Sequence, residues 1–367
     1  MKAATETPSR NLALELIRVT EAAAISAARE QGRGDKELVD QAAVDAMRQV
    51  LGRTDLDGIV VIGEGEKDEA PMLFNGERVG NGNLPEVDVA VDPVDGTRLT
   101  AEGRGGALAV IALAERGSMY APGSLVYMDK IAVGEKAAGT IDINAPVRHN
   151  LEQVGKAVGK EINEITAIIL DRPRNEDYVR RVREAGARIS LIGDGDIQAA
   201  IATCIQGNGI DIMLGIGGSP EAVTTACAMA ALHGEIQCKL WPRNDSERQY
   251  AADNGLDLDQ VLTTRDLVDS DDTFFAATGV TDGPLLQGVG FGADYTATHS
   301  VIMRSRSGTL RFVDARHRVD WVEGDRRDLG IDDPGQRQRI GVEVGVRVDA
   351  VRPGIDPATR HRIAPAI

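Results

Sequence analysis

Apolar residues recur at helical spacing in two segments near the start of the chain. These segments cover residues 12–23 and 36–51, where apolar side chains stand three or four positions apart. Asp35, just ahead of the second segment, is placed to cap that helix. Runs typical of strands follow at four places: 59–62, 87–91, 105–114 and 131–143. We therefore expect two helices ahead of any strand and an α/β organisation for this part of the chain.

The middle of the chain alternates between strand-like and helix-like segments. The strand-like segments are 165–170, 188–192, 210–214 and 235–240, and helices are expected after Asn175, Asp196, Pro220 and Asn244. Residues 273–313 are again rich in strand-forming sequence. Such βαβ alternation predicts sheets that are covered by helices. We expect two α/β halves, 1–150 and 151–314, followed by a tail at 315–367.

Composition and charge narrow the possible functions. The chain of 367 residues has a formal charge of −16, which argues against nucleic acids and anionic membranes as partners. With 42% hydrophobic residues it has the composition of a folded protein. The tail differs, because it holds ten arginines, no lysine and nine acidic residues. We interpret it as a weakly ordered extension of unknown role, in which the alternation at 342–351 predicts one strand.

The cysteines and the lengths of the apolar runs indicate the cellular compartment in which the protein is expected. Cys204, Cys227 and Cys238 form no CxxC pair and no cluster with histidine, which fits small buried side chains in a reducing compartment. The first residues contain no apolar signal segment, and no run of about 18 apolar residues occurs. We expect a soluble, cytoplasmic protein.

The most informative stretch is the acidic end of the strand at 87–91. Asp92 follows this strand, Pro93 is expected to end its hydrogen-bond ladder, and Asp95 comes three residues later. Two carboxylates so close repel each other unless a cation lies between them. Mg²⁺ or Mn²⁺ suits such oxygen ligands when no imidazole or thiolate is near. Gly96 and Thr97 then open a helix, whose free N–H groups favour a phosphate.

Acidic residues also follow two other strands. Glu64, Glu66 and Asp68 lie in a glycine-containing segment after the strand at 59–62, and Glu221 lies early in the helix after Pro220. Together with Asp35, these residues make a two-metal phosphate-transfer site a reasonable hypothesis. Each cluster also has a simpler interpretation as a turn, a solvated loop or a helix cap. The repeated combination of strand, carboxylate and glycine favours the site.

Seven motifs in the chain, the stretch from Asp92 to Thr97 and six others, resemble one group of enzymes. The stretch from Asp92 to Thr97 is similar to the lithium-sensitive, metal-dependent sugar phosphatases, which include inositol monophosphatase and fructose bisphosphatases. The remaining motifs resemble class II (GlpX-type) fructose-1,6-bisphosphatase: Gly32–Lys36, Val61–Met72, Tyr127–Lys130, Asp171–Arg174, Gly193–Asp196 and Ile216–Glu221. The resemblance covers about residues 8–314. It implies a layered αβαβα fold with two sheet-containing halves, to which the tail is added.

The resemblance also assigns residues to roles. It implies metal ligands at Asp35, Glu64, Asp92, Asp95 and Glu221. It implies contacts with a sugar phosphate at Asp95, Gly96, Thr97, Tyr127, Arg172, Pro173, Arg174, Asp194, Gly195, Asp196 and Gly218. Thr97, with Glu66 or Asp68, is expected to orient the attacking water. Arginine forks clamp phosphates, which agrees with the second set.

We therefore expect a phosphatase that removes the 1-phosphate of fructose 1,6-bisphosphate with two divalent cations, Mn²⁺ or Mg²⁺. Its partner would be this small sugar bisphosphate, with no nucleic acid and no membrane. The family's usual assembly implies a homodimer or homotetramer. Two alternatives stay open at this point. One is a dual phosphatase that also cleaves sedoheptulose 1,7-bisphosphate, and the other is a non-catalytic sugar-phosphate sensor.

Overall fold

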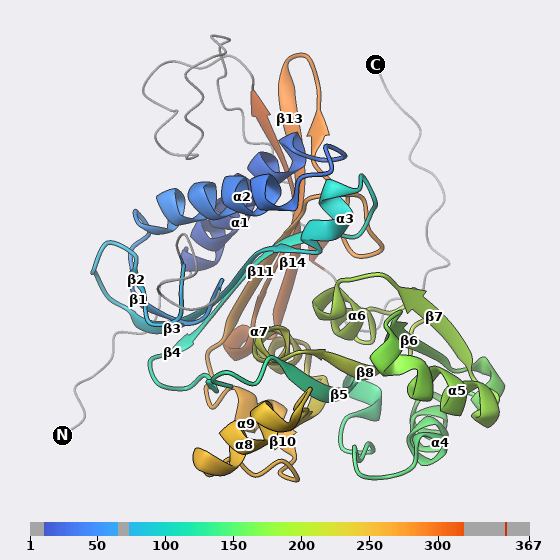
Figure 1. The fold of residues 1–367 in the computed structure, drawn as a ribbon. Helices are drawn as coiled ribbons and strands as arrows, with labels where there is room; N and C mark the ends of the chain where they lie inside the picture. The colour runs from blue at the N-terminus through green and yellow to red at the C-terminus, as the bar shows by residue number, and fades with distance from the viewer. Residues whose placement is uncertain (1–10, 65–72, 319–348, 351–367) are drawn as a thin grey trace, which may run out of the picture.

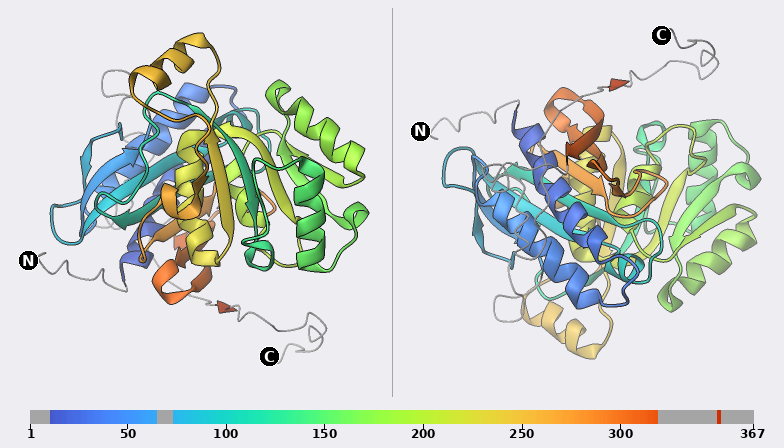
Figure 2. Two further views of the ribbon diagram at one scale, coloured as in Figure 1. Left: turned by 90° about the horizontal axis from the view of Figure 1, so that it is seen from below. Right: turned by 90° about the horizontal axis from the view of Figure 1, so that it is seen from above.

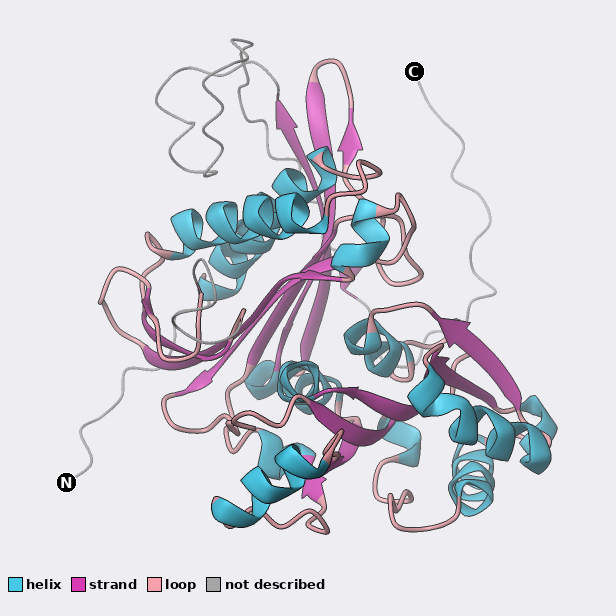
Figure 3. Ribbon diagram, viewed as in Figure 1, coloured by secondary structure: helices cyan, strands magenta, loops and turns pink. Residues whose placement is uncertain are grey.

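Two mixed β-sheets with helices on both sides of each make up the protein. The computed structural model describes residues 11–64, 73–318 and 349–350. Figure 1 shows α1 and α2 on the outer face of the first sheet, and α4 and α5 on the far side of the second. Helices α6 and α7 lie between the sheets, in one apolar cluster that contains side chains from both. The five layers confirm the predicted αβαβα arrangement, which Figure 3 shows as alternating helix and strand.

The first sheet brings together strands from distant parts of the sequence. Its order is β15 (Asp349–Ala350), β14 (Thr309–Arg318), β13 (Tyr295–Arg304), β11 (Phe274–Gly279), β4 (Leu108–Glu115), β3 (Glu86–Asp95), β1 (Asp57–Ile62) and β2 (Arg78–Val79). β12 (Gly290–Phe291) pairs with β13. β1 and β3 are parallel, so their carboxyl ends lie at the same edge of the sheet.

The second sheet has the order β10 (Leu262–Thr263), β9 (Glu235–Leu240), β5 (Tyr127–Val133), β8 (Ile212–Gly218), β6 (Thr166–Leu170) and β7 (Arg188–Ile192). β6, β7 and β8 run parallel to one another, while β5 is antiparallel to β8. The carboxyl ends of the parallel strands therefore also share one edge. Loops at this edge carry the arginines and aspartates that the sequence singled out.

The helices follow from the apolar pattern of each segment. α1 (Leu12–Arg29) packs against both α2 (Lys36–Leu51) and the first sheet and is buried on most sides. α2 buries one face in the same apolar cluster, and α4 (Val147–Val158) and α5 (Glu176–Ala185) each bury one face against the second sheet. α7 (Ser219–Leu232) is buried on almost every side, as expected for a helix between two sheets, and α6 (Asp196–Ala202) packs beside it. The shorter helices are α3 (Thr97–Ala101), α8 (Asp245–Asp253) and α9 (Thr264–Leu267). Among the described residues, no helix is both long and apolar enough to cross a bilayer.

Most predicted elements are present, and three differ from expectation. The predicted strand at 131–143 begins at Tyr127 and ends at Val133. Pro93 does not end its strand, because β3 continues to Asp95 through a bulge, a position where the missing N–H of proline is tolerated. The predicted strand at 342–351 corresponds to β15, of which only Asp349–Ala350 lies within the described residues.

The assignment of strands to the two sheets does not follow the predicted division of the chain into halves at residue 150. β11, β13 and β14, all late in the chain, complete the sheet that β1 to β4 begin. β5 precedes residue 150 but lies in the second sheet. The view from above in Figure 2 shows late strands, in orange, next to the blue N-terminal helices, and α1 contacts β11 and β13. A domain boundary near residue 150 stays a prediction.

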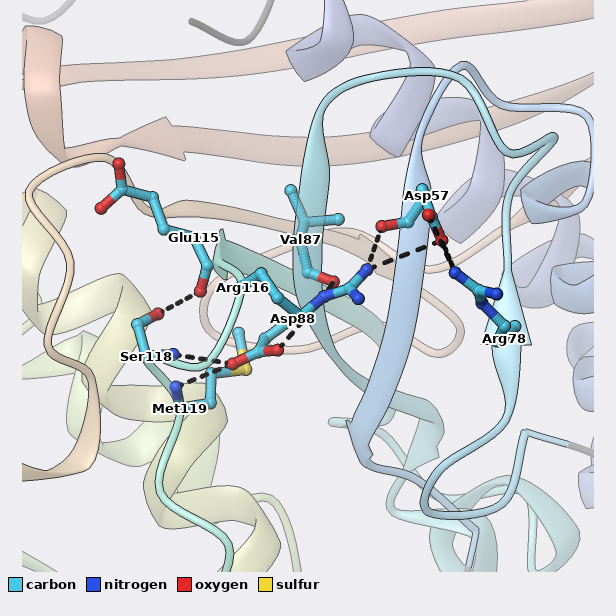
Figure 4. Close-up of polar contacts among 8 residues, drawn as sticks. All are labelled: Asp57, Arg78, Val87, Asp88, Glu115, Arg116, Ser118 and Met119. Atoms are coloured by element: carbon cyan, nitrogen blue, oxygen red, sulfur yellow. Dashed lines mark hydrogen bonds and ion pairs between the residues drawn. The ribbon is translucent and has the colours of Figure 1, made fainter. Parts of the chain in front are cut away.

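Arg116 ties down the amino ends of β1 and β3, opposite the ends that carry the acidic motifs (Figure 4). Its Nε donates to the carbonyl oxygen of Val87 at 3.0 Å, and its guanidinium also donates to the carbonyl oxygen of Asp57. The carboxylate of Asp88 accepts from the backbone N–H groups of Ser118 and Met119, at 2.9 and 3.1 Å. These bonds hold the two strands in register with each other and with the chain that leaves β4.

Glu21 joins α1 to the β13–β14 hairpin. Its Oε1 accepts a 2.9 Å hydrogen bond from the Thr298 hydroxyl, which also lies 3.0 Å from Nε2 of His317. Burial raises the pKa of Glu21 to about 7 and lowers that of His317 to about 4. Glu21 is therefore mostly neutral below about pH 7, and His317 is neutral above about pH 4, at the interface of the helix and the sheet.

We expect Glu21→Gln to stabilise the protein at alkaline pH only. Glu21 ionises near its ordinary pKa of 4.5 in the unfolded chain but near 7 in the folded one. Its contribution to the unfolding free energy is therefore lost as the pH rises through this window. Urea unfolding should give the variant an advantage of about 3 kcal/mol at pH 8 that vanishes near pH 4. Glu15→Gln, on the exposed face of α1, is the control, and an equal effect at both pH values would contradict the prediction.

Candidate active site

A cavity of about 490 Å³ lies where the carboxyl ends of β1, β3 and β8 meet the loops after β6 and β7. It brings most of the predicted site residues together from segments up to about half the chain apart. The predicted residues that line it are Glu64, Asp92, Asp95, Gly96, Thr97, Tyr127, Arg172, Arg174, Asp194, Gly195, Asp196, Gly218 and Glu221. One wall is acidic and the other carries guanidinium groups.

Two predicted residues that the structure describes, Asp35 and Pro173, do not line the cavity. Asp35 is exposed, and its carboxylate caps α2 by accepting a 3.0 Å hydrogen bond from the N–H of Leu38. Pro173 opens the 3₁₀ turn after β6 without lining the cavity. Glu66 and Asp68 lie outside the described residues. The capping interpretation of Asp35 is confirmed, and its role as a metal ligand stays a prediction.

Asp40 is the main lining residue that sequence reasoning missed. It stands in α2, one turn after Lys36, and its Oδ1 accepts a 2.6 Å hydrogen bond from the Thr97 hydroxyl. Because Lys36 and Asp40 are four residues apart, they share a helix face, and this spacing was the available signal. Arg98 and Thr224 also line the cavity and were not predicted.

The acidic wall depends on two local backbone features. The bulge at Pro93 lets β3 present Asp92 and Asp95 at one edge of the sheet. Gly96 then turns the chain into α3 with a φ of 97°, a conformation that disfavours side chains. Gly218 is needed for another reason, since a Cβ there would come within 1.8 Å of Oε2 of Glu221.

The carboxylates of this wall are buried together and raise one another's pKa. Burial, followed by the charges of Asp40 and Glu221, raises the pKa of Glu64 to about 7. Burial and neighbouring carboxylates raise the pKa values of Asp92 and Asp95 well above the ordinary range. Oδ2 of Asp95 and Oε2 of Glu221 are buried and have no hydrogen-bond partner among the described residues. Ionising these carboxyl groups together is therefore costly unless a cation compensates their charge.

These observations fit a hard divalent cation. The donors are all carboxylate oxygens, which suit Mg²⁺ and Mn²⁺, and two of them lack any other partner. Within the described residues, no group of three acidic, histidine or cysteine side chains is close enough to form a complete metal site. The wall thus has the right chemistry for cations, without a preformed cage.

The opposite wall presents guanidinium groups. Asp194 anchors two of them, because its carboxylate pairs with Arg172 and also accepts from Nε of Arg98 at 3.2 Å. Arg174 donates to the carbonyl oxygen of Ile216 at 3.0 Å and stacks over the Tyr127 ring, 4.3 Å from its centroid. Such preorganised forks bind phosphate oxygens in a bidentate manner. The cavity thus offers one end to cations and the other to an anion.

Comparisons with known proteins decide the family. The family model described as bacterial fructose-1,6-bisphosphatase, glpX-encoded, matches residues 10–317. The chain belongs to this family. Fructose-1,6-bisphosphatase 1 class 2 of Escherichia coli K12 is 42% identical over 325 residues, which covers 85% of this chain and 96% of that protein. The class 2 enzyme of Shigella flexneri matches to the same extent.

Membership of the glpX family confirms the resemblance and the activity class drawn from the motifs. The chain is a phosphatase, and the sensor alternative loses its support. The family match ends at residue 317, within β14, so most of the arginine-rich tail lies outside it. The tail is thus an addition to the part of the chain that carries the site.

We expect Asp95→Asn to stabilise the metal-free protein. Asp95 is 6% exposed, and its raised pKa means that ionisation opposes folding as the pH rises. Urea unfolding in EDTA at pH 8 should show a gain of about 1 to 3 kcal/mol. Asp194→Asn is the matched control and should lose stability, because both of its oxygens are paired with arginines. A loss in both variants would contradict this account.

Proposed function

We propose that the chain hydrolyses the 1-phosphate of fructose 1,6-bisphosphate to fructose 6-phosphate and phosphate, as in gluconeogenesis. The observation that carries this proposal is the opposition of the two walls of one cavity in a glpX-family protein. A sugar with a phosphate at each end matches a site with cations at one end and guanidinium groups at the other. We assign the 1-phosphate to the acidic wall and the 6-phosphate to Arg172 and Arg174.

We propose that Asp40, Glu64, Asp92, Asp95 and Glu221 hold the divalent cations, Mn²⁺ or Mg²⁺, with two ions as the expected number. Asp40 replaces Asp35 in this set because Asp40 lines the cavity and Asp35 caps α2. When bound, the cations would neutralise phosphoryl charge and lower the pKa of the attacking water. The buried, unpartnered oxygens of Asp95 and Glu221 support this assignment.

The protein's own residues then orient the reaction. We assign to the Thr97 hydroxyl, which donates a hydrogen bond to Asp40, the role of aligning the attacking water, and this hydrogen bond supports the assignment. The water oxygen forms a new bond to phosphorus while the bond from phosphorus to the C1 oxygen breaks, and that oxygen takes up a proton. Asp194 and Asp196 accept hydrogen bonds from hydroxyl groups of the sugar. Tyr127 and Arg174 enclose the end of the substrate that carries the 6-phosphate. Glu66 and Asp68 remain candidates for binding the water.

Phosphate release from a small panel of substrates tests the proposal. The panel contains fructose 1,6-bisphosphate, sedoheptulose 1,7-bisphosphate, fructose 1-phosphate and inositol 1-phosphate, each with Mg²⁺, Mn²⁺ or EDTA. We expect the first to be cleaved with the highest kcat/KM and EDTA to abolish turnover. Equal rates on the two bisphosphates would favour the alternative of a phosphatase with dual specificity. Turnover in EDTA would contradict the proposed metal-dependent mechanism. Dimeric or tetrameric assembly and a cytoplasmic location stay predictions.

Asp40 and Asp35 provide a matched pair of variants. Asp40→Asn removes a proposed metal ligand and the partner of Thr97, so kcat should fall about 100-fold or more. Asp35→Asn keeps an effective helix cap and should turn over at close to the wild-type rate. Both are measured with fructose 1,6-bisphosphate and saturating Mn²⁺. The reverse ranking would restore Asp35 as the ligand.

A further inference from the structure

Lys130 is a charged residue in an otherwise apolar column of β5. It is 1% exposed and lies between Met128 and Ala132, which point to the same side of the second sheet and belong to the core between the sheets. An apolar side chain would fill this position at no electrostatic cost. Burying an ammonium group costs several kcal/mol unless it is well paired.

The partner of Lys130 is Asp196, the first residue of α6 and part of the cavity lining. Nζ of Lys130 donates to Oδ2 of Asp196 at 2.7 Å, and both side chains are buried. Gly217 makes room for this pair, because a Cβ there would lie 2.0 Å from Oδ2 and 3.1 Å from Nζ. Three segments therefore accommodate one ion pair behind the acidic wall: β5 supplies the lysine, α6 supplies the aspartate, and the glycine of β8 leaves space for both.

The charge of Lys130 is retained despite its burial. Burial lowers the pKa of Lys130, but the carboxylates of Asp196 and Glu221 more than offset this, and the net shift is upward. The same ammonium lowers the pKa values of Asp95 and Glu221, although burial and the neighbouring carboxylates raise them overall. Lys130 is thus a built-in cation behind a wall of carboxylates.

We propose that Lys130 is a positioning residue that fixes the orientation of Asp196, so that Asp196 can accept a hydrogen bond from a hydroxyl group of the sugar phosphate. This inference rests on the proposed function and deepens it. One oxygen of Asp196 is engaged by Lys130, which leaves the other for the ligand. A purely structural pair would be replaceable by apolar residues, often with no loss of stability. A positioning pair is not, because substrate affinity depends on it.

The test compares the buried pair of Lys130 and Asp196 with a second Lys–Asp pair, formed by Lys160 after α4 and Asp211 just before β8, whose lysine is partly exposed. Lys130→Met is expected to raise the KM for fructose 1,6-bisphosphate about tenfold with little change in kcat, because it weakens a contact made in both the ground and transition states. Lys160→Met, which breaks the pair with Asp211 away from the cavity, should leave KM unchanged. Gly217→Ala should raise KM as Lys130→Met does, since it displaces the same pair.

A double variant covers the case in which Lys130→Met does not fold. Lys130→Met with Asp196→Asn removes both buried charges, and its KM should equal that of Asp196→Asn alone if Lys130 acts through Asp196. Calorimetric titration of fructose 6-phosphate in EDTA gives a readout that is independent of turnover. We expect the Kd to rise in Lys130→Met and to stay unchanged in Lys160→Met.

The two proposals fail in different ways. Wild-type protein that binds fructose 6-phosphate but does not release phosphate from the bisphosphate would overturn the proposed function, while the Kd comparison would still test Lys130. An active Lys130→Met variant with wild-type KM and Kd, lowered only in its melting temperature, would overturn the role of Lys130 alone. The role of Lys130 would also be overturned if the KM increases caused by Lys130→Met and Asp196→Asn multiplied in the double variant.

Discussion

The structure depends on the burial of several carboxylates at one point between two sheets. Asp92, Asp95, Glu64 and Glu221 come from three strand ends, and burial together with mutual repulsion raises their pKa values. Such an arrangement opposes folding, so the surrounding layers must supply the stability that it removes. The extensive apolar clusters on both faces of the first sheet do so. The strain is electrostatic, and in the proposed function binding of cations would relieve it.

The rest of the site distributes charge around this acidic wall. Lys130 lies behind it as a fixed, buried cation, while Arg172 and Arg174 face it across the cavity. Asp194 keeps the arginine side ordered by pairing with two guanidinium groups. In the proposed mode of binding, cations held by the acidic wall would attract one phosphate of the substrate and the guanidinium groups would attract the other. This arrangement resolves the apparent conflict between a protein of charge −16 and an anionic substrate.

The fold explains how remote segments hold these groups at fixed distances. Arg116 fixes the amino ends of β1 and β3, so their carboxyl ends emerge side by side. α7 contacts strands of both sheets and carries Glu221 in its first turn. α2 brings Asp40 to Thr97 from the outer helical layer. The tail shares a short strand pairing with β14 but lies mostly beyond the family match.

The sequence by itself determined the element types, the family and most of the lining residues, because these depend on local periodicity and on short motifs. It indicated that acidic residues follow the strands of residues 59–62 and 87–91, and parallel pairing then placed them together. Only the tertiary structure showed that Asp40 lines the cavity while Asp35 caps α2, since which helical residue faces the cavity depends on how α2 packs. It also placed β11, β13 and β14 in the first sheet, and Lys130 beside Asp196. Strand pairing and burial join residues far apart in the chain, and no local pattern encodes those contacts.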